Sequence, residues 1–483
     1  MDTDPPTAST PLIWRIALAA AVLTLGAAAV LAGDLIGPRG QAALGLLCFF
    51  SIAAACSANL RAINWHTVVW GIGLQVLLAL FVLKIGFTRT TPPEAIHDFH
   101  LQQTVAVIGA GPLGPLNAAA LTKPAPPETY FYRPGYEFFR AAAGVIKKLL
   151  QFSEQGALFV FGSLADGRKE FIFAFSALPT IIFISSFFTV LYYLGVLQIV
   201  VRVVALVMSK LMRTSGAETL SVTANVFMGQ TEAPLIVKPY VERLTRSELL
   251  AMMVGGMAHI SGGLMAVYIG MGADAVAILA TSVMASPCSL YLSKVMLPET
   301  GRPETLGVVQ AQVEQTHANV IDAAAAGASD GMRLALNIAA MLIAFLAFIA
   351  LFDALLSWLK PGLSLAQLFG TVFAPVASLM GVEPADSPRM GNLLGTKLVA
   401  NEFVAYTEFK KYVANGELSE RSRILATYAL TGFANIASIG IQIGGIGALA
   451  PSRRADLAQL GGWALLTGFL VTLINASLAG LLM

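Results

Sequence analysis

Residues 229–234 read Gly-Gln-Thr-Glu-Ala-Pro and residues 401–404 read Asn-Glu-Phe-Val, and both motifs lie inside long apolar stretches. Each motif places a carboxylate, Glu232 or Glu402, where a membrane-embedded segment is expected. An ionised group at the centre of a bilayer costs at least about 2.5–3.5 kcal/mol on insertion scales, so by default it marks a substrate or ion site. The two glutamates therefore indicate a pathway for a solute or an ion.

The composition is that of a membrane protein. Of 483 residues, 56% are hydrophobic and only 12% are charged, and the mean hydropathy is +0.73. A soluble protein carries about twice this charged fraction. A helix needs about 20 apolar residues to cross a bilayer, and we predict an all-α polytopic membrane protein with nine crossings. The predicted spans are 12–32, 41–59, 66–86, 172–198, 247–271, 274–292, 332–358, 419–446 and 459–482.

Several other classes of site are disfavoured. The net charge is +2 and there is no long basic run, so nucleic acid is not an expected partner. Cys48, Cys56 and Cys288 lie in apolar segments and have no disulfide or zinc spacing. Residues 109–114 match the G-x-G-x-x-G dinucleotide pattern, but Pro112 spoils the helix start that this pattern needs. We expect no cofactor.

Two further regions, 199–245 and 365–415, are apolar but interrupted. Breaks are expected midway, at 214–216 and 381–388, so neither half of either region is a comfortable full span. Both regions are interpreted as re-entrant helical hairpins, which enter the membrane and turn back. Such backbone is tolerated only where protein or a water-filled cavity surrounds it.

An internal repeat relates the two hairpins. Segments 172–292 and 332–482 both run span, hairpin, span, span, and Gly-Met-Ala-His-Ile at 256–260 aligns with Gly-Phe-Ala-Asn-Ile at 432–436. Each unit has three crossings, an odd number, so the second unit has the opposite orientation in the membrane. An inverted repeat with broken transmembrane helices is typical of secondary transporters and places the site at the repeat interface.

The predicted organisation has five parts, and basic loop residues place the N-terminus in the cytoplasm and the C-terminus outside it. An amphipathic interfacial helix is expected at 138–155, after a Pro-rich loop at 88–137. The parts are an extra N-terminal transmembrane helix (1–40), scaffold helices with the extracytoplasmic loop and the interfacial helix (41–171), the first repeat with hairpin 1 (172–292), a cytoplasmic connector (293–331), and the second repeat with hairpin 2 (332–483).

The first motif carries an amide, a hydroxyl and a carboxylate at Gln230, Thr231 and Glu232. This mixture of donors and acceptors suits the edge of a heterocyclic base. The alternative is a buried Glu232 that only pins the hairpin. We prefer the binding role because no Lys or Arg lies near enough in sequence to neutralise this carboxylate.

The second motif suits a sugar. A carboxylate such as Glu402 can accept hydrogen bonds from two vicinal hydroxyls, as in a ribose. In the aligned broken span, Asn435 and Ser438 are three residues apart and share a helical face. Phe433 could pack against a ring, although a lone Phe in a membrane helix is more often a packing residue. The alternative for Glu402 is again an internal pin.

Three stretches together resemble the concentrative nucleoside transporter family. They are Gly-Gln-Thr-Glu-Ala-Pro-Leu at 229–235, Asn-Glu-Phe-Val-Ala-Tyr at 401–406 and Gly-Phe-Ala-Asn at 432–435, and the resemblance covers most of 41–483. It implies a homotrimer in a bacterial inner membrane that imports nucleosides by symport with sodium or protons. Alternating access is the implied mechanism.

The resemblance also implies roles for single residues. For the nucleobase these are Gln230, Thr231 and Glu232; for the ribose Glu402, Asn435 and Ser438; for the pocket lining Phe433 and Leu264; and for sodium Asn225 and the carbonyls of Met228, His259 and Ile260.

One position departs from the family pattern. Sodium-coupled relatives tend to have a small hydroxyl residue where His259 stands. Sodium prefers oxygen ligands, and a histidine titrates near neutral pH, so proton coupling stays open beside sodium coupling.

Two rival functions are considered. The first is a cation-coupled carrier of another polar solute, such as a free nucleobase or an amino acid. The second is a channel or a membrane enzyme, which the paired hairpins and the lack of a nucleophile–histidine pair oppose. We expect a transporter and no enzyme activity.

Overall fold

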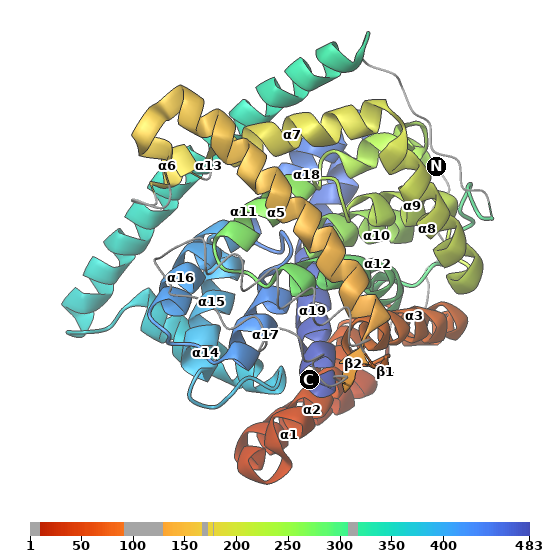
Figure 1. Cartoon of the computed structure of the whole chain (residues 1–483). Helices are drawn as coiled ribbons and strands as arrows, with labels where there is room; N and C mark the ends of the chain where they lie inside the picture. Colours follow the sequence, from red (N-terminus) through yellow and green to blue (C-terminus); the bar gives the residue numbers. More distant parts are fainter. Residues whose placement is uncertain (1–9, 91–128, 167–171, 177, 308–316) are drawn as a thin grey trace.

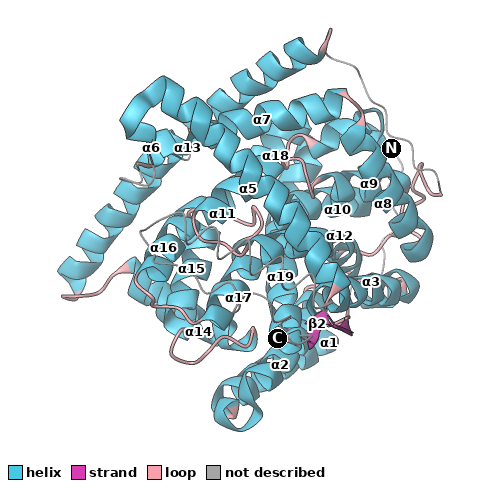
Figure 2. Cartoon of the chain, in the orientation of Figure 1, coloured by secondary structure: helices cyan, strands magenta, loops and turns pink. Residues whose placement is uncertain are grey.

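A computed structural model of the chain describes residues 10–90, 129–166, 172–176, 178–307 and 317–483. These residues are mainly helical (Figures 1 and 2), and the all-α polytopic fold class is confirmed. Most of the predicted 88–137 loop, including the dinucleotide-like motif at 109–114, lies outside the described residues.

The N-terminal part contains three apolar helices, a short β-ribbon and a long amphipathic helix. Strands β1 and β2 pair antiparallel, Phe87 opposite Tyr132 and Thr90 opposite Thr129, so they bring the ends of the predicted loop together. The interfacial helix predicted at 138–155 is α5, which crosses the front of the molecule in Figure 1. The bounds are α1 Leu12–Leu31, α2 Gly33–Ala55, α3 Trp65–Leu83, β1 Phe87–Thr90, β2 Thr129–Tyr132 and α5 Pro134–Phe161.

The two repeats have parallel element orders. The first contains α7 Leu178–Tyr193, α8 Val196–Met212, α9 Gly216–Ala224, the 3₁₀ helix η4 Ala233–Arg243, α10 Arg246–Ala258, α11 Gly262–Gly270 and α12 Ala275–Met296. The second contains α13 Val320–Leu359, α14 Leu365–Leu379, α15 Ser387–Val399, α16 Glu402–Ala414, α17 Glu420–Leu430, α18 Ile436–Leu449 and α19 Arg454–Leu482. Short pieces are η1 Leu60–Ala62, η3 Gly162–Ala165, α6 Phe173–Ser176 and η5 Pro451–Arg453.

Nearly all the predicted crossings appear as helices. In the described part of the chain, eight segments are long and apolar enough to span a membrane. The predicted span 419–446 consists of two shorter helices, α17 and α18, separated at 431–435, where an interrupted span was expected. The predicted span 247–271 is likewise broken, between α10 and α11 at 259–261.

The hairpins are shorter than predicted. Residues 214–216, predicted as the break of hairpin 1, start α9: Arg213 has a left-handed φ of 56°, and Ser215 and Glu218 form a capping box. The tip of hairpin 1 is therefore at 225–232, between α9 and η4. Hairpin 2 is α15 and α16 with its tip at Ala400 and Asn401. Helices α8 and α14, predicted as hairpin halves, are separate elements before each hairpin.

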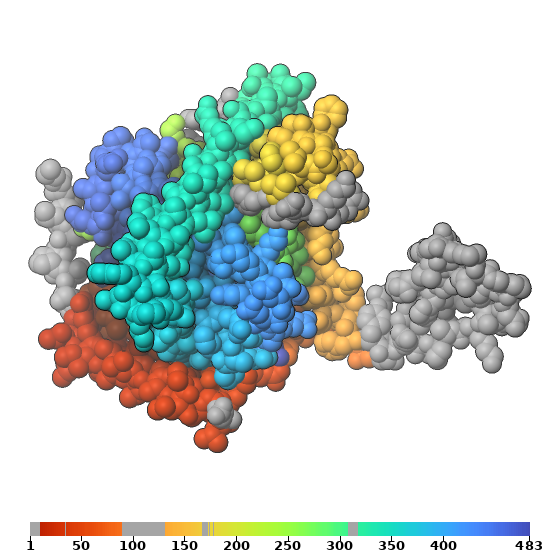
Figure 3. Space-filling view, turned by 90° about the vertical axis from the view of Figure 1, so that its left-hand side faces the viewer, coloured from red at the N-terminus to blue at the C-terminus, as the bar shows by residue number. Residues whose placement is uncertain are grey.

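Three central spans form the core, and others form the rim. The most apolar windows of α10–α11, α12 and α19 are 89%, 83% and 78% buried, whereas those of α1 and α13 are 6% and 17% buried. The 40-residue α13 crosses the outside of the molecule in Figure 3. Gly327 and Gly331 let α13 approach α7, because a Cβ at Gly331 would lie 2.7 Å from the Cα of Ile182.

Gly432, in the break between α17 and α18, allows a test of how closely this break packs against the end of α10. Gly432 has φ of 134°, and a Cβ there would lie 2.9 Å from the carbonyl oxygen of Ala258. We expect Gly432→Ala to cost about 1–3 kcal/mol of stability and to lower the thermal unfolding midpoint in detergent. Gly440→Ala is the matched control, because a Cβ at Gly440 meets nothing within 4 Å. Equal midpoints for the two variants would contradict the crowding described here.

Candidate functional site

The two helix breaks meet each other in the centre of the molecule. The Phe433 amide, in the break between α17 and α18, donates to the His259 carbonyl at 3.1 Å, in the break between α10 and α11. Hairpin 1 joins the same place, because the Gly262 amide donates to the Phe227 carbonyl at 3.0 Å. Backbone groups freed by broken helices therefore pair across segments, as membrane-embedded backbone must.

A cavity of about 180 Å³ lies at this junction. All eight predicted substrate-binding residues line it: Gln230, Thr231, Glu232, Leu264, Glu402, Phe433, Asn435 and Ser438. They come from hairpin 1, α11, hairpin 2 and the α17–α18 break, so both repeats contribute. The cavity is therefore at the repeat interface.

Glu402 is a buried carboxylate with oriented donors. It is 5% exposed and begins α16, where Asn401 caps the helix by accepting from the Val404 amide at 2.8 Å. The Tyr268 hydroxyl donates to Oε1 at 3.0 Å, and the Asn435 amide donates to Oε2 at 3.0 Å. Each carboxylate oxygen has a further lone pair, so Glu402 can still accept hydrogen bonds from a ligand.

The Gln230 amide is held between the repeats. Its Nε2 donates to Ser438 Oγ at 3.2 Å, and its Oε1 accepts from Gln442 Nε2 at 3.2 Å. Gln442 also donates to the Met253 carbonyl at 3.0 Å. The Gln230 amide therefore lines the cavity with its oxygen and nitrogen positions already set.

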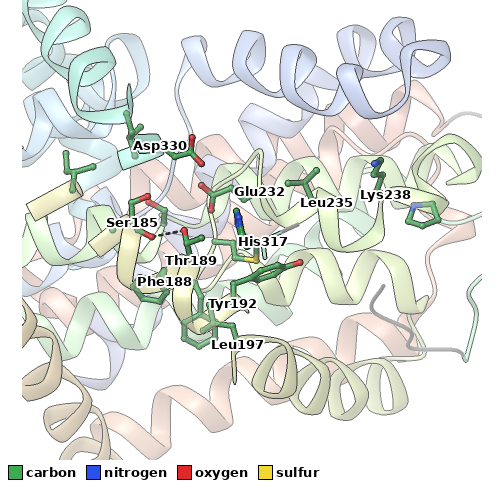
Figure 4. A pocket seen from close by; sticks show the side chains of 17 residues that line it. Ser185, Phe188, Thr189, Tyr192, Leu197, Glu232, Leu235, Lys238, His317 and Asp330 are labelled. Atoms are coloured by element: carbon green, nitrogen blue, oxygen red, sulfur yellow. Dashed lines mark hydrogen bonds between the residues drawn. The ribbon is translucent and has the colours of Figure 1, made fainter. Parts of the chain in front are cut away.

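Glu232 faces water-accessible space. Its Oε2 accepts from the Gly229 amide at 3.0 Å, which keeps the side chain folded back over the hairpin tip. Glu232, Ser261 and Leu334 line both the first cavity and a larger one of about 270 Å³, so the two adjoin. Figure 4 shows Glu232, Lys238, His317 and Asp330 around this larger cavity.

Asn225, a predicted sodium ligand, has an unused oxygen. The side chain is 1% exposed, and its Nδ2 donates to the Ser221 carbonyl at 2.9 Å. Asn225 Oδ1 has no hydrogen-bond partner among the described residues. A buried carbonyl-type oxygen without a donor is costly, and it suits a hard cation. The unpaired oxygen of Asn225 therefore fits its predicted role as a sodium ligand.

The His259 ring is tied to α12. Nδ1 is 2.8 Å from the Gly255 carbonyl, and Nε2 is 3.1 Å from Ser286 Oγ. A carbonyl only accepts, so we assign the hydrogen to Nδ1, and the neutral ring then accepts from the Ser286 hydroxyl at Nε2. Both ring nitrogens thus have partners outside the predicted ion ligands, while the His259 carbonyl accepts from Phe433.

Sequence reasoning did not identify several contributors. Tyr268 and Gln442 orient the predicted residues but belong to no recognised motif. One face of α13 closes the cavity, and its period of three and four residues was visible within a stretch interpreted only as a span. These residues are Leu334, Ile338, Met341 and Leu342.

Comparisons with known proteins find several similar sequences. Three family models match the chain: "Na+ dependent nucleoside transporter N-terminus" at 44–91, "Nucleoside recognition" at 174–275 and "Na+ dependent nucleoside transporter C-terminus" at 277–480. An uncharacterised transporter of Haemophilus influenzae is 40% identical over 91% of this chain and 96% of its own length. The sodium/nucleoside cotransporter 1 of Mus musculus is 39% identical over 91% of this chain, which spans 63% of that protein.

Solved structures of CNTnw are also similar. Its inward-facing substrate-bound state is 34% identical, covers 92% of this chain and 97% of its own, and has a TM-score of 0.77. A variant of the same protein in an outward-facing state covers the same shares with a TM-score of 0.79.

Asn225 supplies a test of the cation site. We expect sodium to stabilise the folded wild type by about 2.7 kcal/mol at a hundredfold excess over its dissociation constant. The thermal unfolding midpoint should rise accordingly. Asn225→Leu removes the oxygen and should abolish this sodium-dependent shift. Asn392→Leu, in the first helix of hairpin 2, is the matched control: it removes the buried amide that donates to Tyr412 at 2.9 Å and should keep the shift. A full sodium shift in Asn225→Leu would exclude this ligand.

Proposed function

The chain belongs to the concentrative, Na+-dependent nucleoside transporter family, and we propose that it is a symporter that carries a nucleoside and a sodium ion together into the cell by alternating access. The observation that carries the proposal is the single cavity lined by polar residues of both repeats, Gln230 and Glu232 on one side and Glu402 and Asn435 on the other. A nucleoside has a base and a sugar that match these two sets.

The base contacts hairpin 1. Gln230 offers one donor and one acceptor at fixed positions, and Thr231 and Glu232 add a hydroxyl and a carboxylate beside it. Leu264 and Phe433 supply apolar surface for the ring. A base can replace the Ser438 hydroxyl as the partner of the Gln230 amide.

The ribose contacts hairpin 2 and the second broken helix. Glu402 accepts from two sugar hydroxyls, while Asn435 and Ser438 hold the sugar from α18. Tyr268 and Asn435 keep the carboxylate in place, so little ordering is needed on binding. A free nucleobase leaves this half of the cavity unused, which favours nucleosides over bases.

Sodium couples to the nucleoside through hairpin 1. Asn225 and the Met228 carbonyl precede Gln230 on the same tip, and the carbonyls of His259 and Ile260 complete the ligand set from the broken span. An ion that orders this tip favours base binding, and nucleoside must favour sodium binding by the same factor. The His259 ring nitrogens contact Gly255 and Ser286 and none of the other predicted ion ligands, so the ring leaves the proposed sodium site to the backbone carbonyls.

The larger cavity indicates the conformation. It is lined by Leu197, Lys238 and His317, which lie on the side that basic loops assign to the cytoplasm. This placement supports a conformation in which the nucleoside site opens toward the cytoplasm. We place the protein in a bacterial inner membrane with a cytoplasmic N-terminus and an extracytoplasmic C-terminus, as a homotrimer with nucleoside and lipid as its partners.

The test is uptake of labelled uridine and adenosine into proteoliposomes, with sodium and pH gradients varied independently. An inward sodium gradient should drive accumulation, and a proton gradient alone should not. Protein-free liposomes and collapse of the gradient by a sodium ionophore are the controls. Accumulation driven by protons without sodium would overturn the choice of ion, and adenine outcompeting both nucleosides would overturn the choice of substrate.

The ribose contact has its own prediction. Glu402→Gln should weaken uridine affinity by about 3 kcal/mol, roughly a hundredfold, because a neutral amide accepts two hydroxyl hydrogen bonds less well than a carboxylate. The affinity for 2′,3′-dideoxyuridine, which lacks those hydroxyls, should change far less. Glu408→Gln alters a half-exposed carboxylate on the same helix and serves as control. Equal losses for both ligands would remove the ribose role of Glu402.

A further inference from the structure

Lys397 is a fully buried lysine in the first helix of hairpin 2, with 0% of its surface exposed. An ionisable side chain inside a membrane protein is expensive and is by default functional. The nucleoside and sodium contacts described above do not use it. The inference about its role rests on the proposed symport.

The partners of Lys397 are all acceptors. Its Nζ donates to the Ala429 carbonyl at 2.7 Å and to Thr472 Oγ1 at 3.2 Å, and it lies 5.7 Å from the centre of the Phe469 ring. Thr472 donates its own hydrogen to the Phe469 carbonyl at 2.8 Å, so it presents a lone pair to Lys397. Ala429 is in the last turn of α17, where unpaired carbonyls attract cations. These surroundings suit a charged ammonium group.

The charge of Lys397 acts on the ribose carboxylate. Glu402 follows Lys397 by five positions, across the hairpin tip, and no ion pair within 4 Å joins the two groups in the described structure. Burial disfavours the charged form of each group, and their mutual attraction opposes this effect. The charged residues that line the smaller cavity, within the described part of the chain, are Glu232 and Glu402. Lys397 is not among the residues that line this cavity, so its charge acts on the two carboxylates only through the cavity wall.

The two hairpins carry different groups near the end of their first helices. Asn225 is four residues before the Gly229 motif, at the end of α9, and Lys397 is four residues before the Asn401 motif, in the last turn of α15. The first position carries an open oxygen next to a broken helix, suited to binding a cation. The second carries a cation next to the other broken helix.

We propose that Lys397 is a tethered cation that does in the second repeat what the coupling sodium ion does in the first. One sodium ion and one lysine then balance the negative charges of Glu232 and Glu402. The loaded site, with its neutral nucleoside, has zero net charge while the nucleoside crosses the membrane. The second repeat needs no ion of its own, so a single sodium ion accompanies each nucleoside. Lys397 is a positioning residue, because it acts through Glu402 and α17.

The first experiment measures the sodium dependence of uridine uptake and of the thermal midpoint. The wild type should respond with a Hill coefficient of about one. Lys397→Gln removes the fixed charge and adds an amide oxygen, so a second sodium ion should bind in place of the lysine. The Hill coefficient for sodium should then rise towards about two. The sodium concentration that gives half-maximal uptake should be at least about tenfold higher than in the wild type. Lys411→Gln, an exposed lysine paired with Glu408, should match the wild type. A wild-type sodium curve in Lys397→Gln overturns the proposal.

The second experiment covers a Lys397→Gln protein that is unstable or inactive. The double variant Lys397→Gln/Glu402→Gln removes both charges, so its thermal midpoint should recover above that of Lys397→Gln. A lysine that only caps α17 gives additive losses and no recovery, which also overturns the proposal. The thermal midpoints are measured without nucleoside. If the wild type bound sodium but carried no nucleoside, the proposed function would be contradicted, and the charge balance could still be tested.

Discussion

The hydrogen bond from the Phe433 amide to the His259 carbonyl is the interaction on which the rest of the structure depends. It joins two interrupted helices, one from each repeat, and it pairs backbone groups that neither helix can satisfy alone. Because the breaks stay open, hairpin tips can approach them: the Phe227 carbonyl pairs with Gly262, and Asn435 reaches Glu402. Polar side chains at membrane depth can then contact protein or ligand instead of lipid. Burial of Glu402 and Lys397 follows from this arrangement.

Much of this arrangement could be predicted from the sequence, because membrane insertion makes charge and length unusually informative. The apolar runs predicted the spans, and the order of interruptions predicted the inverted repeat. The eight substrate residues do line one cavity. Boundaries were less accessible: the capping box of Ser215 and Glu218 turns an expected break into a helix start, and the separate helices α8 and α14 share the composition of hairpin halves. Tyr268 and Gln442 could not be found at all, since their importance lies in contacts between segments far apart in sequence.

The repeats share a plan but differ in chemistry. The second half of hairpin 1 is a 3₁₀ helix, and its tip presents an amide, a hydroxyl and a carboxylate, whereas hairpin 2 is two regular helices that present a carboxylate at a helix start. The proposed function assigns the ion and the base to the first half of this site and the sugar to the second half. Asn225 and Lys397 follow the same division, with an uncharged oxygen ligand in one half and a covalently held cation in the other. In this proposal, residues 225–232 form one continuous tip that contacts both the ion and the base.

The length of α13 has a consequence for the surrounding lipid. Forty residues at about 1.5 Å each give a rod about 60 Å long, twice the hydrocarbon thickness of about 30 Å. Such a rod must lean strongly or project beyond the bilayer. One face of it closes the cavity through Leu334 and Ile338, while outer residues such as Ile343 and Trp358 are 74% and 87% exposed. The inclination of this single rod thus ties the acyl-chain length of the host bilayer to the shape of a pocket in the protein interior.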